Sequence, residues 1–159
     1  MRFTKMEGLG NDYIYLNCLS HRPPDPAGLA VRLSDRHFGV GADGLICVCP
    51  GRRGDFAMEM YNADGSRGKM CGNGIRCLGK YVYDKGLTRR TSLQVDTDSG
   101  LRALRLLPGP AGIGQVEVDM GEPSVFPQIS IPLMELTYSV MPVSMGLSLI
   151  HISEPTRLG

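Results

Sequence analysis

The chain has 159 residues, of which 42% are apolar and 21% are charged, and its formal net charge is +1. This composition is typical of a soluble globular protein with one domain and room for the start of a second. The near-zero charge and the absence of any run of about 18 apolar residues argue against both nucleic acid and a membrane as partners.

The first half of the sequence predicts short strands and one helix. Apolar, aromatic and β-branched residues predict strands, while the segment after a proline-rich loop predicts a helix. Glycine-rich turns separate these elements. The expected strands are residues 2–7, 13–16, 45–49 and 56–61, and the expected helix is residues 27–38.

The segment from Cys71 to Asp84 has the clearest helical pattern of the chain. Ile75, Leu78 and Val82 recur at i, i+3 and i+7, and Gly86 is placed to end the helix. Three expected strands follow, at residues 92–97, 101–107 and 114–120. Residues 1–120 therefore predict an α+β domain.

The rest of the sequence is less regular. Residues 131–144 have strand character that two prolines interrupt, and residues 147–159 continue no pattern. We expect residues 121–146 to be the incomplete start of a second domain and residues 147–159 to be a non-native tail.

The stretch NADGSRGKMCGNGIRC, residues 62–77, carries the strongest chemical signal. It places the thiol of Cys71 at the start of a helix, where the first backbone N–H groups lack internal partners and attract anions. Such a helix end favours the thiolate of Cys71 and can hold a carboxylate. A thiolate beside a bound carboxylate is placed to remove the proton from the adjacent α-carbon.

The five cysteines are Cys18, Cys47, Cys49, Cys71 and Cys77, and their odd number favours reduced thiols over disulfides. A cysteine is most often a small buried apolar residue, and we expect this for all of them except Cys71. Cys47 and Cys49 share one face of a strand, and Cys77 lies on the buried face of the helix. A purely structural thiol at Cys71 remains the alternative.

Motifs for other kinds of site fail at specific positions. Gly68-Lys69 is followed by Met70, which breaks a P-loop, and Cys77 stands where a dinucleotide-binding motif needs its last glycine. Cys47-x-Cys49 has the wrong spacing for zinc, and no HxxxH pair is present. We therefore expect no metal and no nucleotide cofactor. The N-terminus has no apolar segment typical of a signal peptide, so we expect a cytoplasmic location.

Three separated motifs resemble the diaminopimelate epimerase family: GLGNDY at residues 8–13, FGVGADGL at residues 38–45, and NADGS with MCGNGIRC within residues 62–77. VDMGEP and PVSMG extend the resemblance, which covers residues 2–146. Proline racemases and hydroxyproline epimerases, which are similar in fold, typically carry His where Asn73 stands.

The resemblance implies a fold of mostly antiparallel strands wrapped around a central helix, in each of two similar halves. It implies the interconversion of LL- and meso-diaminopimelate, toward lysine and peptidoglycan, without a cofactor. Two cysteines face the α-carbon from opposite sides, and one acts as base while the other acts as acid.

The resemblance also implies roles for particular residues. Cys71 matches the first of the two catalytic cysteines. Gly72 and Asn73 match the helix-end residues that bind the α-carboxylate, and Asn11 and Asn62 match substrate-binding asparagines. Some members carry a substrate-binding Gln where Gly44 stands here. We interpret Asp12 and Asp43 as turn residues.

The chain also departs from the family pattern. A full member is about twice as long and continues Asn-Pro-His after the Ser144-Met145-Gly146 segment, and the sequence holds no second Cys-Gly context. We therefore expect the isolated chain to be inactive or nearly so, unless a homodimer supplies the second group. The alternatives are a non-catalytic fragment and a racemase of the same fold that acts on another amino acid.

Overall fold

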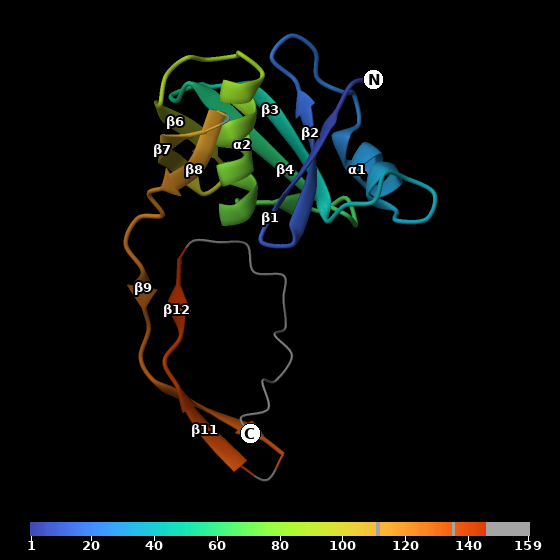
Figure 1. Ribbon diagram of the computed structural model, residues 1–159. Coiled ribbons are helices and arrows are strands. Elements are labelled where there is room, and N and C mark those ends of the chain that lie inside the picture. Colours follow the sequence, from blue (N-terminus) through green and yellow to red (C-terminus); the bar gives the residue numbers. More distant parts are fainter. Residues whose placement is uncertain (111, 135, 146–159) are drawn as a thin grey trace.

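The computed structural model describes residues 1–110, 112–134 and 136–145. The tail expected at residues 147–159 lies outside the described residues. Figure 1 shows the elements in chain order. They are β1 (Thr4–Gly8), β2 (Asn11–Asn17), α1 (Pro26–Ser34), β3 (Gly44–Pro50), β4 (Phe56–Asn62), β5 (Arg67–Gly68), α2 (Gly72–Asp84), β6 (Ser92–Thr97), β7 (Gly100–Gly109), β8 (Gly112–Val118), β9 (Ser124–Val125), β10 (Ile129–Leu133), β11 (Leu136–Val140) and β12 (Val143–Ser144).

The first eight strands form one mixed sheet. Its order is β1-β2-β3-β4-β6-β7-β8, and β5 pairs with β4. Two neighbouring pairs are parallel, β2 with β3 and β4 with β6, and the other pairs are antiparallel. Parallel neighbours need a crossover connection, and the two helices lie in these two crossovers. The predicted α+β class is confirmed.

The sheet curls around α2. This helix contacts strands from both ends of the sheet order, β1 and β8, as well as β2 and β7 (Figure 1). The predicted apolar face is confirmed, because Ile75, Leu78 and Val82 are fully buried. Gly86, with φ of 68°, follows the last helical turn in the left-handed conformation that favours glycine.

The two helices cover opposite faces of the central strands. Side chains alternate along a strand, so Ile46 and Val48 of β3 pack in the core of α2, while Leu45 and Cys47 pack in the core of α1. Both faces of β3 are therefore buried, which explains its nearly continuous apolar sequence.

Helix α1 is shorter than the sequence predicts. We expected a helix over residues 27–38, but α1 ends at Ser34 and is N-capped by Asp25, whose carboxylate accepts a hydrogen bond from Gly28. Asp35 leaves the helical conformation, with φ of −55° and ψ of 123°, and its side chain accepts hydrogen bonds from the amides of His37 and Phe38. This turn replaces the last helical turn.

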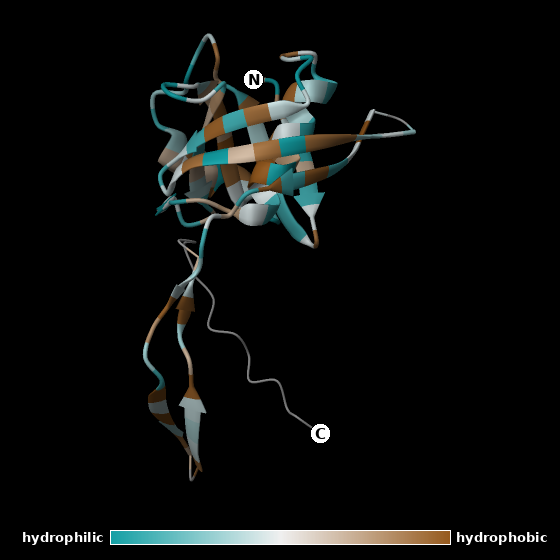
Figure 2. Ribbon diagram, turned by 90° about the vertical axis from the view of Figure 1, so that its left-hand side faces the viewer, coloured by the Kyte–Doolittle hydropathy of each residue, from teal (hydrophilic) through white to brown (hydrophobic). Residues whose placement is uncertain are grey.

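Residues 124–144 form two short antiparallel pairs outside the main sheet, β10 with β11 and β9 with β12. None of the described residues in this segment is buried. Apolar side chains such as Ile131, Leu136 and Tyr138 are exposed, and Figure 2 shows apolar bands along this extension. Pro132 lies within β10, and Pro142 lies between β11 and β12. The division of the chain near residue 120 stays a prediction.

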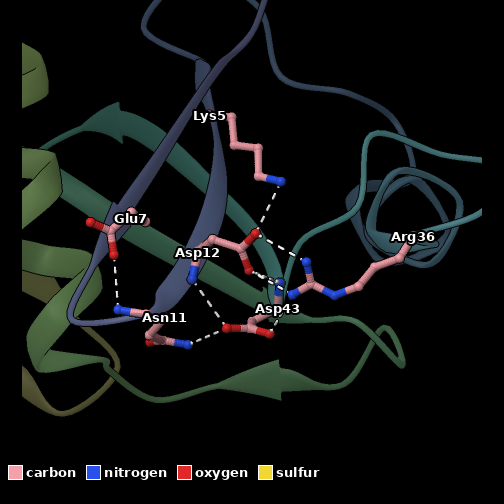
Figure 3. A network of polar contacts seen from close by, with 7 residues as sticks. Lys5, Glu7, Asn11, Asp12, Arg36 and Asp43 are labelled. Carbon is pink, nitrogen blue, oxygen red and sulfur yellow. Dashed lines mark hydrogen bonds and ion pairs between the residues drawn. The ribbon is translucent and has the colours of Figure 1, made fainter.

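An ion network ties the segment after α1 to the start of the sheet (Figure 3). Arg36 donates two hydrogen bonds to Asp12, at 2.8 and 3.2 Å, and one to Asp43 at 3.0 Å. Lys5 Nζ lies 3.0 Å from the Asp12 carboxylate. The hydrogen bond from Arg36 is the main cause that lowers the pKa of Asp12 to about 2, with Lys5 adding to it. Both aspartates are thus more than the turn residues that the sequence suggested.

Gly44 lies where two strands and an aromatic ring approach closely. A Cβ atom at this position would lie 2.2 Å from the Tyr61 carbonyl oxygen and 3.0 Å from Cε1 of Tyr13. The carbonyl belongs to the β4 backbone, so a side chain at position 44 of this chain requires the β3–β4 pairing to shift.

We predict that Gly44→Ala lowers the free energy of unfolding by about 3 kcal/mol, because the added methyl group overpacks a buried backbone contact. Urea unfolding followed by circular dichroism measures the loss. Gly72→Ala is the matched control, because the nearest atom to its Cβ would be 3.9 Å away. Equal losses in the two variants would contradict the prediction.

A second prediction concerns acid stability. A carboxyl whose pKa is lowered in the folded state stabilises that state above its unfolded pKa, here 3.8, and the contribution disappears as pH falls through about 2. Arg36→Gln removes the main cause of this shift. We expect the variant to be less stable than the parent at pH 5 and above, and the two unfolding free energies to converge as pH falls from 4 to 2. A difference that is the same at every pH would count against the ion network.

Candidate active site

Cys71 is the N-cap of α2. Its backbone is extended, with φ of −127° and ψ of 121°, and its carbonyl accepts the first helical hydrogen bond, from Ile75 at 2.8 Å. Its Sγ accepts a hydrogen bond from the amide of Gly74 at 3.3 Å. A serine or aspartate side chain usually makes this capping contact. The predicted position of the thiol at the helix start is confirmed.

The sulfur of Cys71 also contacts Asn11, at the start of β2. Cys71 Sγ donates a hydrogen bond to Asn11 Oδ1 at 3.1 Å, and Asn11 Nδ2 donates one to Asp43 Oδ2 at 2.7 Å. Cys71 is only partly buried. The thiol therefore has a backbone donor on one side and an amide acceptor on the other, an arrangement suited to both the charged and the neutral form.

A cavity of about 580 Å³ opens beside this pair. Asn11, Tyr13, Asp43 and Asn62 are among the residues that line it. Cys71 contacts its wall through Asn11. The structure thus brings three of the predicted site residues, Asn11, Asn62 and Cys71, to one region, although they come from β2, β4 and the start of α2.

Tyr13 is a site residue that sequence reasoning missed. Its side chain is buried, and its hydroxyl lies next to Cys71 and Asn11. Burial, followed by the interaction with Cys71, raises the pKa of Tyr13 above its ordinary value, so the phenol stays protonated and can donate a hydrogen bond. The position of Tyr13 within the GLGNDY motif was the signal that could have identified it.

The predicted residues other than Cys71 and Asn11 make contacts of their own. Asn62 Nδ2 donates to Ser66 Oγ at 2.9 Å, in the lining of the cavity. The Asn73 side chain accepts a hydrogen bond from Arg76 and lines a neighbouring cavity of about 450 Å³, so it does not face Asn11. Within the described part of the chain, the amides of Gly72 and Asn73 have no acceptor. These two amides can therefore receive an anionic group.

The other four cysteines are buried, as predicted. Cys18, Cys47 and Cys49 lie together in the core under α1. Hydrogen bonding to Cys47, together with burial, raises the pKa of Cys18 to about 12. Hydrogen bonding to Cys18, together with burial, raises the pKa of Cys49 above that of Cys18. Burial raises the pKa of Cys77, whose thiol donates to the Glu7 carbonyl at 3.4 Å. Cys71 is the one partly exposed thiol.

No group of three or more His, Cys, Asp or Glu side chains in the described ranges is arranged to hold a metal ion. None of the helices in these ranges has the length and apolar character needed to cross a bilayer.

Known proteins match the chain in sequence. Relatives described as diaminopimelate epimerase include one from Acetivibrio thermocellus, 50% identical over 84% of this chain, and one from Agathobacter rectalis, 52% identical over 80%. A relative from Methanococcus maripaludis is 43% identical over 89% of this chain. These matches cover 47%, 45% and 50% of the relatives, so the chain spans about half of their length.

Solved structures match the fold. A probable proline racemase from Agrobacterium radiobacter superposes with a TM-score of 0.69 over 89% of this chain and 48% of that chain, at 13% identity. A hydroxyproline epimerase from Agrobacterium vitis gives 0.67 over 87% of this chain and 48% of that chain, also at 13% identity. At this identity the likeness concerns the fold alone.

The family model described as diaminopimelate epimerase matches residues 3–126, which include β1 to β8 and all the site residues named above. The chain belongs to the diaminopimelate epimerase family.

Proposed function

We propose that the chain takes part in the interconversion of LL- and meso-diaminopimelate, with Cys71 as one of two acid/base thiols. The observation that carries this proposal is the pair of hydrogen bonds at Cys71 Sγ, one from the Gly74 amide and one to Asn11 Oδ1. Together they let the sulfur alternate between thiolate and thiol, as a group that both removes and returns a proton must do.

The start of α2 is suited to the α-carboxylate of the substrate. The unpaired amides of Gly72 and Asn73 would donate to it, and the positive end of the helix favours its charge. A carboxylate bound there places the α-carbon near Cys71. The Cys71 thiolate then takes the α-proton and becomes the thiol, and the helix end stabilises the negative charge left on the substrate. In the reverse direction of the reaction, the Cys71 thiol donates its proton to the α-carbon.

The asparagines would recognise the far end of the substrate. Asn11 and Asn62 line the cavity next to Cys71, and their amides can pair with both the amino and the carboxylate group. We propose that the Asn73 contribution comes from its backbone amide, because its side chain is turned toward Arg76. The chemistry needs no cofactor, since the thiols alone carry the proton.

Inversion at the α-carbon needs a second group on the opposite face. The chain carries no second cysteine in a Cys-Gly context and spans about half the length of its relatives. We propose that residues 1–120 form the domain that holds Cys71 and that residues 121–146 begin a second domain, whose remainder, or a homodimer, supplies the other thiol. We assign the reaction to the cytoplasm.

We predict that diaminopimelate protects Cys71 from alkylation by iodoacetamide. At a concentration about ten times its Kd, the ligand leaves roughly a tenth of the protein free, so the rate falls about tenfold. Mass spectrometry of the labelled cysteine measures the rate, and Cys71→Ser gives the background. Lysine and proline, which lack the second amino-carboxylate end, are the control ligands. Equal protection by proline would favour a racemase of another amino acid, and no protection by any of them would favour a non-catalytic fragment.

We also predict that the isolated 159-residue chain epimerises LL-diaminopimelate at least 100-fold more slowly than a full-length relative, because one of two acid/base groups contributes about that factor or more. Formation of the meso isomer, followed by chiral chromatography, measures the rate. Full-rate turnover by a monomer, established by sedimentation in the same buffer, would refute the two-thiol mechanism.

A further inference from the structure

The orientation of the Asn11 amide follows from its neighbours. The oxygen and nitrogen of such an amide can be exchanged by a half-turn, so the hydrogen-bond partners must decide between them. Asp43 Oδ2 lies 2.7 Å from one end of the amide, and a carboxylate only accepts hydrogen bonds. The amide nitrogen must therefore face Asp43, which leaves the oxygen facing Cys71.

Asp43 is itself held on both of its oxygens. Its Oδ2 accepts from Asn11 and from the backbone amide of Asp12, at 3.1 Å, while its Oδ1 accepts from Arg36 at 3.0 Å. Arg36 is fixed in turn by its two hydrogen bonds to Asp12. Figure 3 shows Asp43 between Asn11 and Arg36, with each contact drawn. The carboxylate cannot turn away from Asn11 without breaking several of these contacts.

We propose that Asp43, held by Arg36, is a positioning residue that points the Asn11 amide oxygen at the Cys71 thiol and so keeps the proton on that sulfur in the ligand-free chain. An amide oxygen can only accept, so it favours S–H over the thiolate, while a free amide could turn and offer N–H instead. The assignment deepens the proposed function and rests on it for the role of Cys71.

Other groups also face this sulfur and must be separated from Asp43. The Gly74 amide donates to it, and the Tyr13 hydroxyl lies beside it. Tyr15 and Cys77, which is uncharged at neutral pH because burial raises its pKa, interact with Cys71 at longer range. All of these groups are present both in the parent chain and in a variant that replaces Asp43 alone, so they are common to the two sides of the comparison.

The test compares Asp43→Ala with Asp64→Ala in the full 159-residue chain, because an asparagine at position 43 would keep an oxygen that still accepts from Asn11. Both aspartates line the same cavity, so each variant removes one negative charge beside it, but Asp64 binds Ser66 and does not touch Asn11. We expect Asp43→Ala to raise the alkylation rate of Cys71 at pH 7 by about fivefold, the value of one hydrogen bond, and to move the rise of the rate to lower pH. Asp64→Ala should change the rate by less than about twofold. Equal rates in the two variants overturn the proposal.

A second measurement uses the unaltered chain and does not depend on the folding of any variant. The side-chain NH₂ signals of Asn11, assigned by their loss in Asn11→Ala, should exchange with solvent at least about fivefold more slowly than those of Asn17, which donate to no described residue. Equal exchange rates would also overturn the proposal.

These results are independent of the proposed function. The alkylation and exchange experiments use no substrate, so they decide the role of Asp43 even if diaminopimelate does not bind. Conversely, failed protection of Cys71 by diaminopimelate would overturn the proposed function and leave the assignment of Asp43 untouched.

Discussion

The site depends on one contact, the hydrogen bond from the Gly74 amide to the sulfur of Cys71. It places a thiol where a helix normally has an oxygen cap, and thereby fixes the sulfur at the positive end of α2. The carbonyl of Gly74 is held as well, because the buried hydroxyl of Tyr15 donates to it at 2.9 Å. Ile75, the next residue, is fully buried in the core. The position of the sulfur is thus set by the packing of the domain.

The curled sheet explains how distant segments reach that sulfur. Each of the two crossovers leaves a helix on one face, and the starts of β2 and β3 meet the end of β4 at the edge where α2 begins. Asn11, Asp43 and Asn62 stand at these strand ends. Polar side chains at this edge lie beside the cavity, and the sheet holds their backbone in place. Arg36 connects the same edge to the segment after α1, so the helix on the far face also supports the site.

Much of the fold followed from local patterns in the sequence. The buried face of α2 and the strands of the first 120 residues were predictable because their apolar spacing is regular. The end of α1 was not, because the side chain of Asp35 forms a turn that competes with the helix. The parallel pairs also had no local signal, because strand pairing depends on contacts between segments far apart in the chain.

The residues of the site were easier to predict from the sequence than the contacts between them. Cys71 could be placed from the glycines that follow it, and the motifs pointed to Asn11 and Asn62. The contact of Asn11 with Asp43 joins residues 32 positions apart, so no spacing rule reveals it. Asn73 differs: its motif position implies a contact with the α-carboxylate, which stays a proposal for its backbone amide, because Arg76, one helical turn away, donates to its side-chain oxygen.

The distribution of thiols in this chain has a practical consequence. Four sulfurs are enclosed in the two cores, and only that of Cys71 is partly open to solvent. An enclosed thiol reacts with a reagent only when the surrounding core opens, whereas an accessible one reacts in the native state. Labelling kinetics in a single sample therefore contain two rates. The rate at Cys71 reports the reactivity of the thiol at the start of α2, and the rates at the buried cysteines report the opening of the domain. Cys18, Cys47 and Cys49 lie in the core under α1, and Cys77 lies on the buried face of α2, so their labelling reports opening on each side of the sheet without an engineered probe.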